Sequence, residues 1–158
     1  MNEKQQKTLL LGCGVGCGVI ILVAIVLLIV SMILFPRFLE SKAPAIAESI
    51  QRDYADLKTA GRVPAENVAE YDALANLSTE AKPGFWGLLV IKAALDNHLA
   101  DGKVSADEKA EAAKLTEFMK ANPGAGFFKI KSFVSEHPDL EAGMGRIDPS
   151  ALGLTPSR

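Results

Sequence analysis

The stretch "LLGCGVGCGVIILVAIVLLIVSMILF", residues 10–35, decides how this chain is organised. It opens with alternating glycine and cysteine and continues as an unbroken apolar run. Between Gly12 and Phe35 there is no charged residue, and Ser31 carries the only hydroxyl group. A helix over 12–35 would span about 36 Å, enough to cross the hydrocarbon core of a bilayer with some tilt. The sequence therefore predicts a transmembrane helix at 12–35, preceded by a short basic tail at 1–11.

A cleavable secretory signal is the main alternative to a permanent anchor. The apolar region of such a signal is about 7–15 residues long, which is shorter than the run seen here. The small-residue stretch "APAIA" at 43–47 resembles a cleavage site but lies far beyond the apolar run. We therefore expect an uncleaved, single-pass protein of the plasma or inner membrane.

The orientation of the anchor rests on a weak asymmetry of charge. Lys4 and Lys7 precede the apolar run, and Arg37, Lys42 and Arg52 follow it, so the two flanks are nearly matched in basic residues. A very short basic tail before a first apolar segment usually stays in the cytosol. This predicts a cytoplasmic N-terminus and an extracytoplasmic C-terminal domain.

The glycines and cysteines at the start of the run repeat at helical spacing. Pairs of small residues lie four positions apart, which places each pair on one face of a helix. Small residues at this spacing let two membrane helices approach until their backbones touch. The pattern predicts a packing face toward a membrane-protein partner or a second copy of the chain. Its residues are Gly12, Cys13, Gly14, Gly16, Cys17 and Gly18.

The two cysteines have other interpretations. Two thiols make an incomplete metal site, and no His, Asp or Glu lies nearby in the run to complete it. "LLGC" at 10–13 resembles a bacterial lipobox, but a lipobox follows its apolar region whereas here the apolar region follows Cys13. Reversible acylation of Cys13 or Cys17 near the cytosolic face is a further alternative. We favour small, fairly apolar residues at a helix contact.

Composition limits the classes of function. The net charge is −2, which offers no large basic field for nucleic acid. No cysteine follows Cys17, so a disulfide scaffold and a cysteine-based zinc site are excluded outside the membrane.

The chain after the anchor predicts an all-α fold. Pro36 should end or kink the anchor, leaving a linker at 36–43 before a helical domain at 44–137. A helix starting at Pro44 and ending before Gly61 carries one apolar stripe with charges opposite. A second, weaker helix follows Pro64, and "NLSTEAKPG" at 76–84 predicts a break. The stripe of the first helix consists of Ile46, Ile50, Tyr54 and Leu57.

Residues 85–99, "FWGLLVIKAALDNHL", differ from these helices because they are apolar on nearly every side. Such a helix is usually buried at the centre of a domain, and this one is too short to span a membrane. The alternative is a helix on the bilayer surface with Phe85 and Trp86 at headgroup level. We prefer the core because Lys92 alone does not make a basic polar face.

Two further helical pieces complete the predicted domain. Ser105 with Glu108 three positions later forms a capping-box pattern at the start of the clearest amphipathic helix, and "NPG" at 122–124 ends it. Glu111 and Lys114 read as a surface pair on this helix. Residues 127–138 predict one more short amphipathic piece. From 138 to 158 we expect a flexible tail, since large apolar groups are few beyond Glu141.

The segment "NHLADGKVSADE" at 97–108 resembles the loop of an EF-hand. With Gly102 at loop position 6, Glu108 falls at position 12, where a bidentate carboxylate belongs. Leu99 at position 3 offers no oxygen, and calcium needs about 6–8 of them. The segment is also similar to the "ADG" helix–loop–helix of TerB-like domains, which implies an all-helical fold and at most a degenerate metal loop. The candidate ligands are Asn97, Asp101, Lys103, Ser105 and Glu108.

The simpler interpretation of this segment is that Gly102 ends one helix and Ser105 caps the next, with no cofactor bound. No catalytic set is apparent elsewhere. His98 lies in the last turn of a predicted helix, where a positive charge interacts favourably with the helix dipole. Ser135, His137 and Asp139 are near in sequence, but no nucleophile-elbow motif supports a triad.

The sequence therefore predicts a non-enzymatic, membrane-anchored accessory protein that presents a small helical domain beside a membrane complex. The alternative is a calcium-responsive module built on the loop at 97–108.

Overall fold

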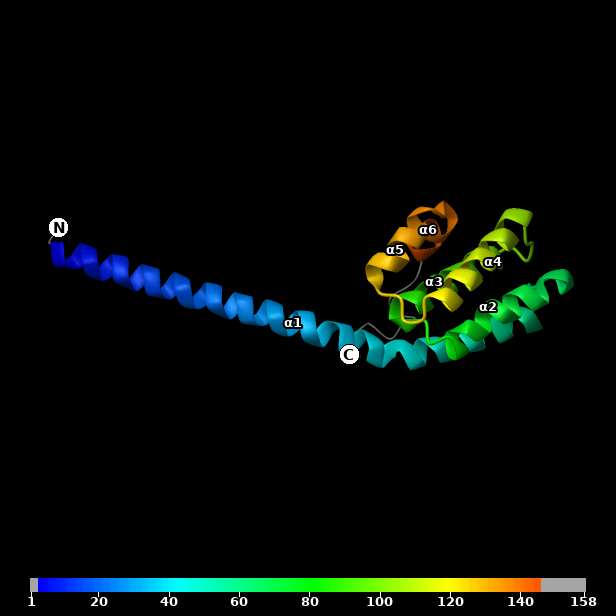
Figure 1. The fold of residues 1–158 in the computed structure, drawn as a ribbon, viewed down its shortest axis with the longest axis horizontal. Coiled ribbons are helices and arrows are strands. Elements are labelled where there is room, and N and C mark those ends of the chain that lie inside the picture. Colours follow the sequence, from blue (N-terminus) through cyan, green and yellow to red (C-terminus); the bar gives the residue numbers. More distant parts are fainter. Residues whose placement is uncertain (1–2, 146–158) are drawn as a thin grey trace. The chain divides into compact units, whose positions relative to one another are not determined.

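The computed structural model describes the backbone of residues 3–145 and the side chains from residue 23 onward. Within this part of the chain all regular secondary structure is helical, which confirms the predicted fold class. Figure 1 shows the helices in chain order. The chain divides into two compact units between Leu39 and Glu40, and each unit is described by itself.

The first unit is the N-terminal part of helix α1, which extends from Glu3 to Thr59. From Val23 onward α1 is long enough and apolar enough to cross a membrane, judged by length and composition. Its large apolar side chains are exposed, from 42% at Val30 to 79% at Met32. Along these residues, no other part of the described chain covers the apolar side chains of α1.

Helix α1 continues through Pro36 and Pro44, so the predicted linker at 36–43 is wrong as a break between helices. A proline inside a helix lacks one N–H donor and crowds the carbonyl four residues earlier, but it removes only one hydrogen bond. The bonds on either side of each proline remain, and α1 continues to Thr59. Beyond that end, Gly61 adopts a φ of +69°, as expected for the residue just past a helix.

In the described residues, the second unit is a helical domain formed by the last part of α1 and helices α2 to α6 (Figure 1). Helix α3, Gly84–His98, lies at its centre and packs against α2, α4, α5 and α6. Val90, Ile91 and Ala94 on α3 are fully buried. The predicted core helix is therefore confirmed, and Phe85, which the alternative placed at headgroup level, is buried as well.

Helix α2, Val68–Glu80, follows a short 3-10 turn at Ala65–Asn67. The predicted break at 76–84 is too long, because α2 continues to Glu80. Leu77 and Ser78 are buried in this last turn, and the Gln51 amide donates to the Ser78 hydroxyl at 3.1 Å. Packing against α1 therefore holds a sequence that by itself favours a loop.

The remaining helices are α4, Ala106–Ala121, α5, Phe127–Ser135, and α6, Pro138–Met144. Helix α6 corrects the predicted domain end at 137 and the predicted start of the flexible tail at 138. Leu140 on α6 is fully buried, and Gly143 lies so close to α3 that an added Cβ would sit 3.2 Å from the Ala93 carbonyl oxygen. Leu140 and Gly143 are the buried residues of this short helix. The rest of the predicted tail, 146–158, lies outside the described residues.

Candidate functional sites

The predicted packing face at the start of the apolar run has a helical backbone. Gly12, Gly14, Gly16 and Gly18 belong to α1, as do Cys13 and Cys17. Their side chains lie outside the described residues, so the packing face stays a prediction from spacing.

The loop at 97–108 uses its polar groups for its own backbone. The Asp101 carboxylate accepts a hydrogen bond from the Lys103 amide at 2.8 Å. The Glu108 carboxylate accepts from the Ser105 amide at 2.8 Å, and the Ser105 hydroxyl accepts from the Glu108 amide at 3.2 Å. These two reciprocal bonds form the predicted capping box of α4. Gly102 has a φ of +72°, which suits the turn before it.

The other candidate calcium ligands do not form a cluster of carboxylates with Glu108. Asn97 is half-buried at the end of α3, and Leu99 is fully buried. Among residues with described side chains, no group of three His, Cys, Asp or Glu side chains is placed to hold a metal ion. The arrangement therefore suits a helix cap and a tight turn.

A buried polar network, which the sequence analysis missed, lies behind this loop. His98 is completely buried. Its Nδ1 lies 3.0 Å from the Tyr71 hydroxyl, and its Nε2 lies 3.0 Å from Glu111 Oε2. Three helices, α2, α3 and α4, thus meet through one histidine.

The network corrects one sequence interpretation and adds to another. Glu111 is buried against His98, whereas the sequence predicted a surface pair with Lys114. His98 lies in the last turn of α3, as predicted, and is there a core residue with two partners. Burial raises the pKa of the Tyr71 hydroxyl, and the charges of Glu108 and Glu111 raise it further. Helical spacing in the sequence gives no distance between residues on three different helices, so it could not reveal this network.

A second buried charge fixes α3 to α1. The Lys92 ammonium lies 2.7 Å from Asp53 on α1 and 3.2 Å from Asp96 on its own helix. Burial opposes the charge on Lys92, but the hydrogen bond to Asp53 and the nearby carboxylates outweigh it, so the pKa of Lys92 is raised. For Asp96, burial raises the carboxyl pKa despite the Lys92 charge. Lys92, the only lysine of the apolar helix α3, is therefore paired with two carboxylates.

A surface groove of about 680 Å³ lies where α1, α2 and the start of α3 meet. At one side of it, the Glu40 carboxylate accepts a weak hydrogen bond from the Phe85 amide at 3.4 Å. Glu48 is exposed along the same side, and Lys82 lies opposite on the α2–α3 turn. The apolar lining is Ala43, Pro44, Ala47, Pro83, Gly84, Leu88 and Gly124. A groove of this size can take a peptide segment or a few side chains of a partner.

Comparison of the chain with protein-family models, with curated proteins and with solved structures gave no match. The class of protein is therefore set by the molecule's own features. These are one helix that is long and apolar enough to cross a membrane and one all-helical domain.

Proposed function

We propose that this chain is a non-enzymatic accessory protein, anchored in the plasma or inner membrane by α1, which presents its helical domain beside a membrane complex. The observation that carries the proposal is the exposed apolar surface of α1 from Val23 to Phe38. An exposed apolar helix of this length is stable in lipid and unstable in water. The N-terminus lies in the cytoplasm and the domain on the other side.

Alkaline carbonate extraction tests the anchor. The full-length chain should stay in the membrane pellet with its N-terminal tail intact. Intact protein in the supernatant contradicts the anchor, and a chain shortened to begin near residue 48 identifies a cleaved signal. Protease added from outside sealed cells tests the orientation, since it should digest the domain without opening the membrane.

The small-residue pattern is the proposed packing face within the bilayer. Apolar side chains gain little by leaving lipid for each other, so close backbone approach supplies the attraction. Gly16→Leu keeps the segment apolar but separates the helices, and association should fall while anchoring survives. Replacing Cys13 and Cys17 with alanine is the matched control, since alanine is also small. If the cysteine change alone abolishes association, the contact depends on thiol chemistry.

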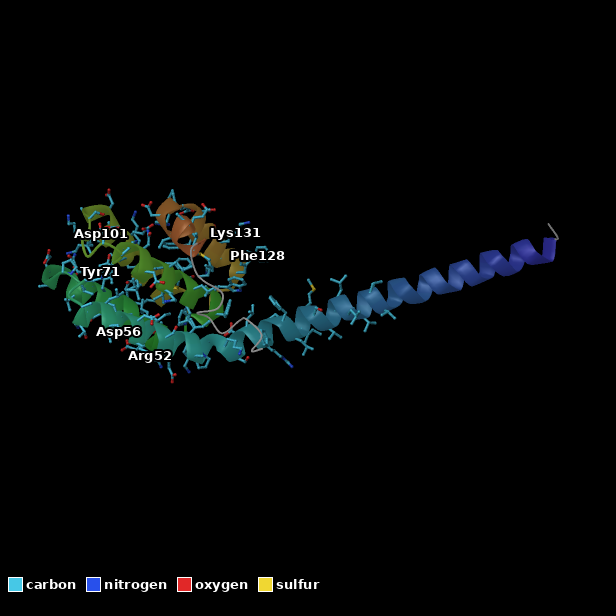
Figure 2. All side chains as sticks on the ribbon, turned by 180° about the vertical axis from the view of Figure 1, so that it is seen from behind. Arg52, Asp56, Tyr71, Asp101, Phe128 and Lys131 are labelled. Carbon is cyan, nitrogen blue, oxygen red and sulfur yellow. The ribbon has the colours of Figure 1, made fainter. Side chains whose placement is uncertain are left out.

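We assign the groove to a segment of the partner that carries basic side chains. Two carboxylates, Glu40 and Glu48, face the groove against the single cation Lys82, so a basic segment is the complementary occupant. Glu48→Lys should reduce co-purification of the partner from native membranes. Asp56→Lys, at a residue labelled in Figure 2 and about two turns farther along α1, makes the same charge change at an exposed position that does not line the groove. Equal losses from both variants would contradict the assignment.

Calorimetry with calcium separates the proposed accessory function from the calcium-responsive alternative. Glu108 and Asp101 already accept backbone hydrogen bonds, and Leu99 supplies no oxygen. We therefore expect no heat of binding at micromolar calcium, and a saturable signal there would favour the alternative.

A further inference from the structure

An aromatic cluster lies on the surface of the domain at the start of α3 and α5. Phe128 is 84% exposed and Phe127 is 41% exposed. The rings of Trp86 and Phe127 have centroids 4.8 Å apart, and those of Phe127 and Phe128 are 5.5 Å apart. These three rings form a continuous patch, which we call the aromatic patch.

Basic side chains accompany the aromatic patch. Lys129 and Lys131 follow the two phenylalanines on α5, and both are exposed. Lys131 also lines, with Trp86, Phe127 and one acidic residue, Glu141, a small hollow of about 190 Å³. Aromatic rings next to lysines suit the boundary between lipid tails and anionic headgroups, because each group then faces the medium it prefers.

The aromatic patch lies at the end of the domain where the chain enters it. Glu40 is the first residue of the domain and follows the exposed apolar run within one helical turn. A Cβ placed on Gly84 would lie 3.5 Å from Glu40 Oε1 and 3.5 Å from the Gly124 Cα, so the segments leading into α3 and α5 meet beside Glu40.

The opposite end of the domain carries a different surface. The part of α1 from Glu40 to Thr59 is about 30 Å long at the helical rise per residue. Figure 2 shows Phe128 and Lys131 at one end of the domain and Asp101 at the other. The aromatic patch with Lys131 thus lies near the point of entry, and the loop that carries Asp101 lies far from it.

We propose that the aromatic patch, with Lys129 and Lys131, rests in the headgroup layer of the bilayer that α1 crosses, and that its ligand is an anionic lipid surface. The proposal rests on the anchored state proposed above. It adds that the domain is held at the membrane surface.

A lipid surface fits the patch better than a second copy of the chain. Covalent attachment keeps the patch near the bilayer at all times, so even a weak contact forms at high effective concentration. A two-fold contact through the patch would bring Lys129 and Lys131 of both copies into one interface, and the gathering of like charges opposes that arrangement.

Trp86 is the only tryptophan in the chain and lies in the patch, so its fluorescence reports the contact directly. The full-length protein is reconstituted in phosphatidylcholine vesicles with and without phosphatidylglycerol. Flotation with the vesicles tests the anchor independently of the patch. A nitroxide on the upper acyl chain of the lipid should quench Trp86, more strongly with phosphatidylglycerol present, and aqueous acrylamide should quench it weakly.

Two outcomes overturn the proposal in protein that floats with vesicles. Strong acrylamide quenching without lipid quenching places Trp86 in water. Shielding from both quenchers places it under protein, either a second copy or another part of the chain. Protein that fails to float contradicts the anchor and not the patch.

Variants give a second readout. Lys131→Glu should reduce quenching by the labelled lipid at least about twofold in phosphatidylglycerol vesicles, because it places a carboxylate against anionic headgroups. Lys103→Glu, in the distant loop, makes the same charge change and should leave quenching unaltered. Phe128→Ser removes the most exposed ring and should also weaken quenching, with circular dichroism confirming the fold. Equal responses of Lys131→Glu and Lys103→Glu would contradict a local contact.

Discussion

Two helical stretches of this chain are apolar on nearly every side, and they lie in different surroundings. In α1, residues 23–38 expose their large side chains, whereas in α3 Val90 and Ile91 have no exposed surface at all. An apolar helix needs an apolar medium on all sides, and only lipid or protein can supply it. The long stretch fits a bilayer, and the short one fits the centre of a domain.

The two stretches also treat polar groups differently. The run from Gly12 to Phe35 contains no charged residue, whereas α3 carries Lys92 and His98. Both are buried, and both have partners on other helices at 2.7–3.0 Å. A protein core can provide such partners at fixed positions, whereas a lipid chain cannot.

The largest expected effect comes from charging the long stretch. Ile25→Asp together with Leu28→Asp should disfavour insertion by about 5–7 kcal/mol, since each carboxylate near the bilayer centre costs about 2.5–3.5 kcal/mol. The protein should move to the carbonate supernatant, while the thermal unfolding of its domain stays the same. Alanine at both positions keeps the stretch apolar and should leave the protein in the pellet. A pellet unchanged by two aspartates would contradict a bilayer environment.

The same charge placed in the short stretch should give the opposite pattern. Ile91→Asp buries an unpaired carboxylate at a fully buried position and should destabilise the domain by several kcal/mol, enough to unfold it. The protein should remain in the membrane pellet but lose its cooperative melting transition. Ile91→Val, the conservative control, should cost about 0.5–1.5 kcal/mol. A domain that tolerates the aspartate would contradict the central position of α3.

Replacing His98 of α3 tests how much a buried polar group contributes to stability through its partners in the protein core. His98→Phe keeps a ring of similar size but leaves the Tyr71 hydroxyl and the Glu111 carboxylate without this partner. We expect a loss of about 2–3 kcal/mol in the free energy of unfolding, measured with denaturant. His137→Phe, at a half-buried histidine, should cost less than half as much. Equal losses would show that the network adds nothing beyond packing.

The domain should respond to alkaline pH, unlike the exposed apolar stretch of α1. Burial raises the pKa of Tyr54 and of Tyr71 in the folded state above the ordinary value of 10.0. Above pH 10 the unfolded chain therefore releases protons that the folded domain retains, and stability falls as pH rises. The slope is at most about 1.4 kcal/mol per pH unit for each tyrosine.

Denaturant titrations between pH 9 and 11 measure this slope. Tyr54→Phe should flatten it, because one of the two tyrosines no longer titrates. A slope equal to that of the unsubstituted protein would show that Tyr54 does not contribute.

The smallest effect concerns the cap that follows α3. Ser105→Ala removes the hydroxyl that accepts from the Glu108 amide and should cost about 1 kcal/mol. Ser132→Ala, at an exposed serine inside α5, is the matched control and should change stability by less than about 0.5 kcal/mol. Equal effects would remove the support for a capping role.

The sequence by itself determined the features that depend on local pattern. The apolar run, the buried character of α3 and the capping box at Ser105 and Glu108 are each carried by residues within a few turns of one another. The lengths of the two apolar stretches also predicted that the one in α1 suits a bilayer and that the one in α3 suits a protein core. The local sequence did not predict that α1 continues through Pro36, nor that a separate short helix, α6, forms at Pro138–Met144.

Only the tertiary structure decided how the buried polar groups are satisfied. His98, Tyr71 and Glu111 lie on three helices and are separated in sequence, so no periodicity could bring them together. The same is true of Lys92 and Asp53, and of the aromatic patch, where Trp86 meets Phe127 from another helix. Packing sets these distances, because each helix is placed by the apolar residues of all its neighbours and not by its own sequence alone.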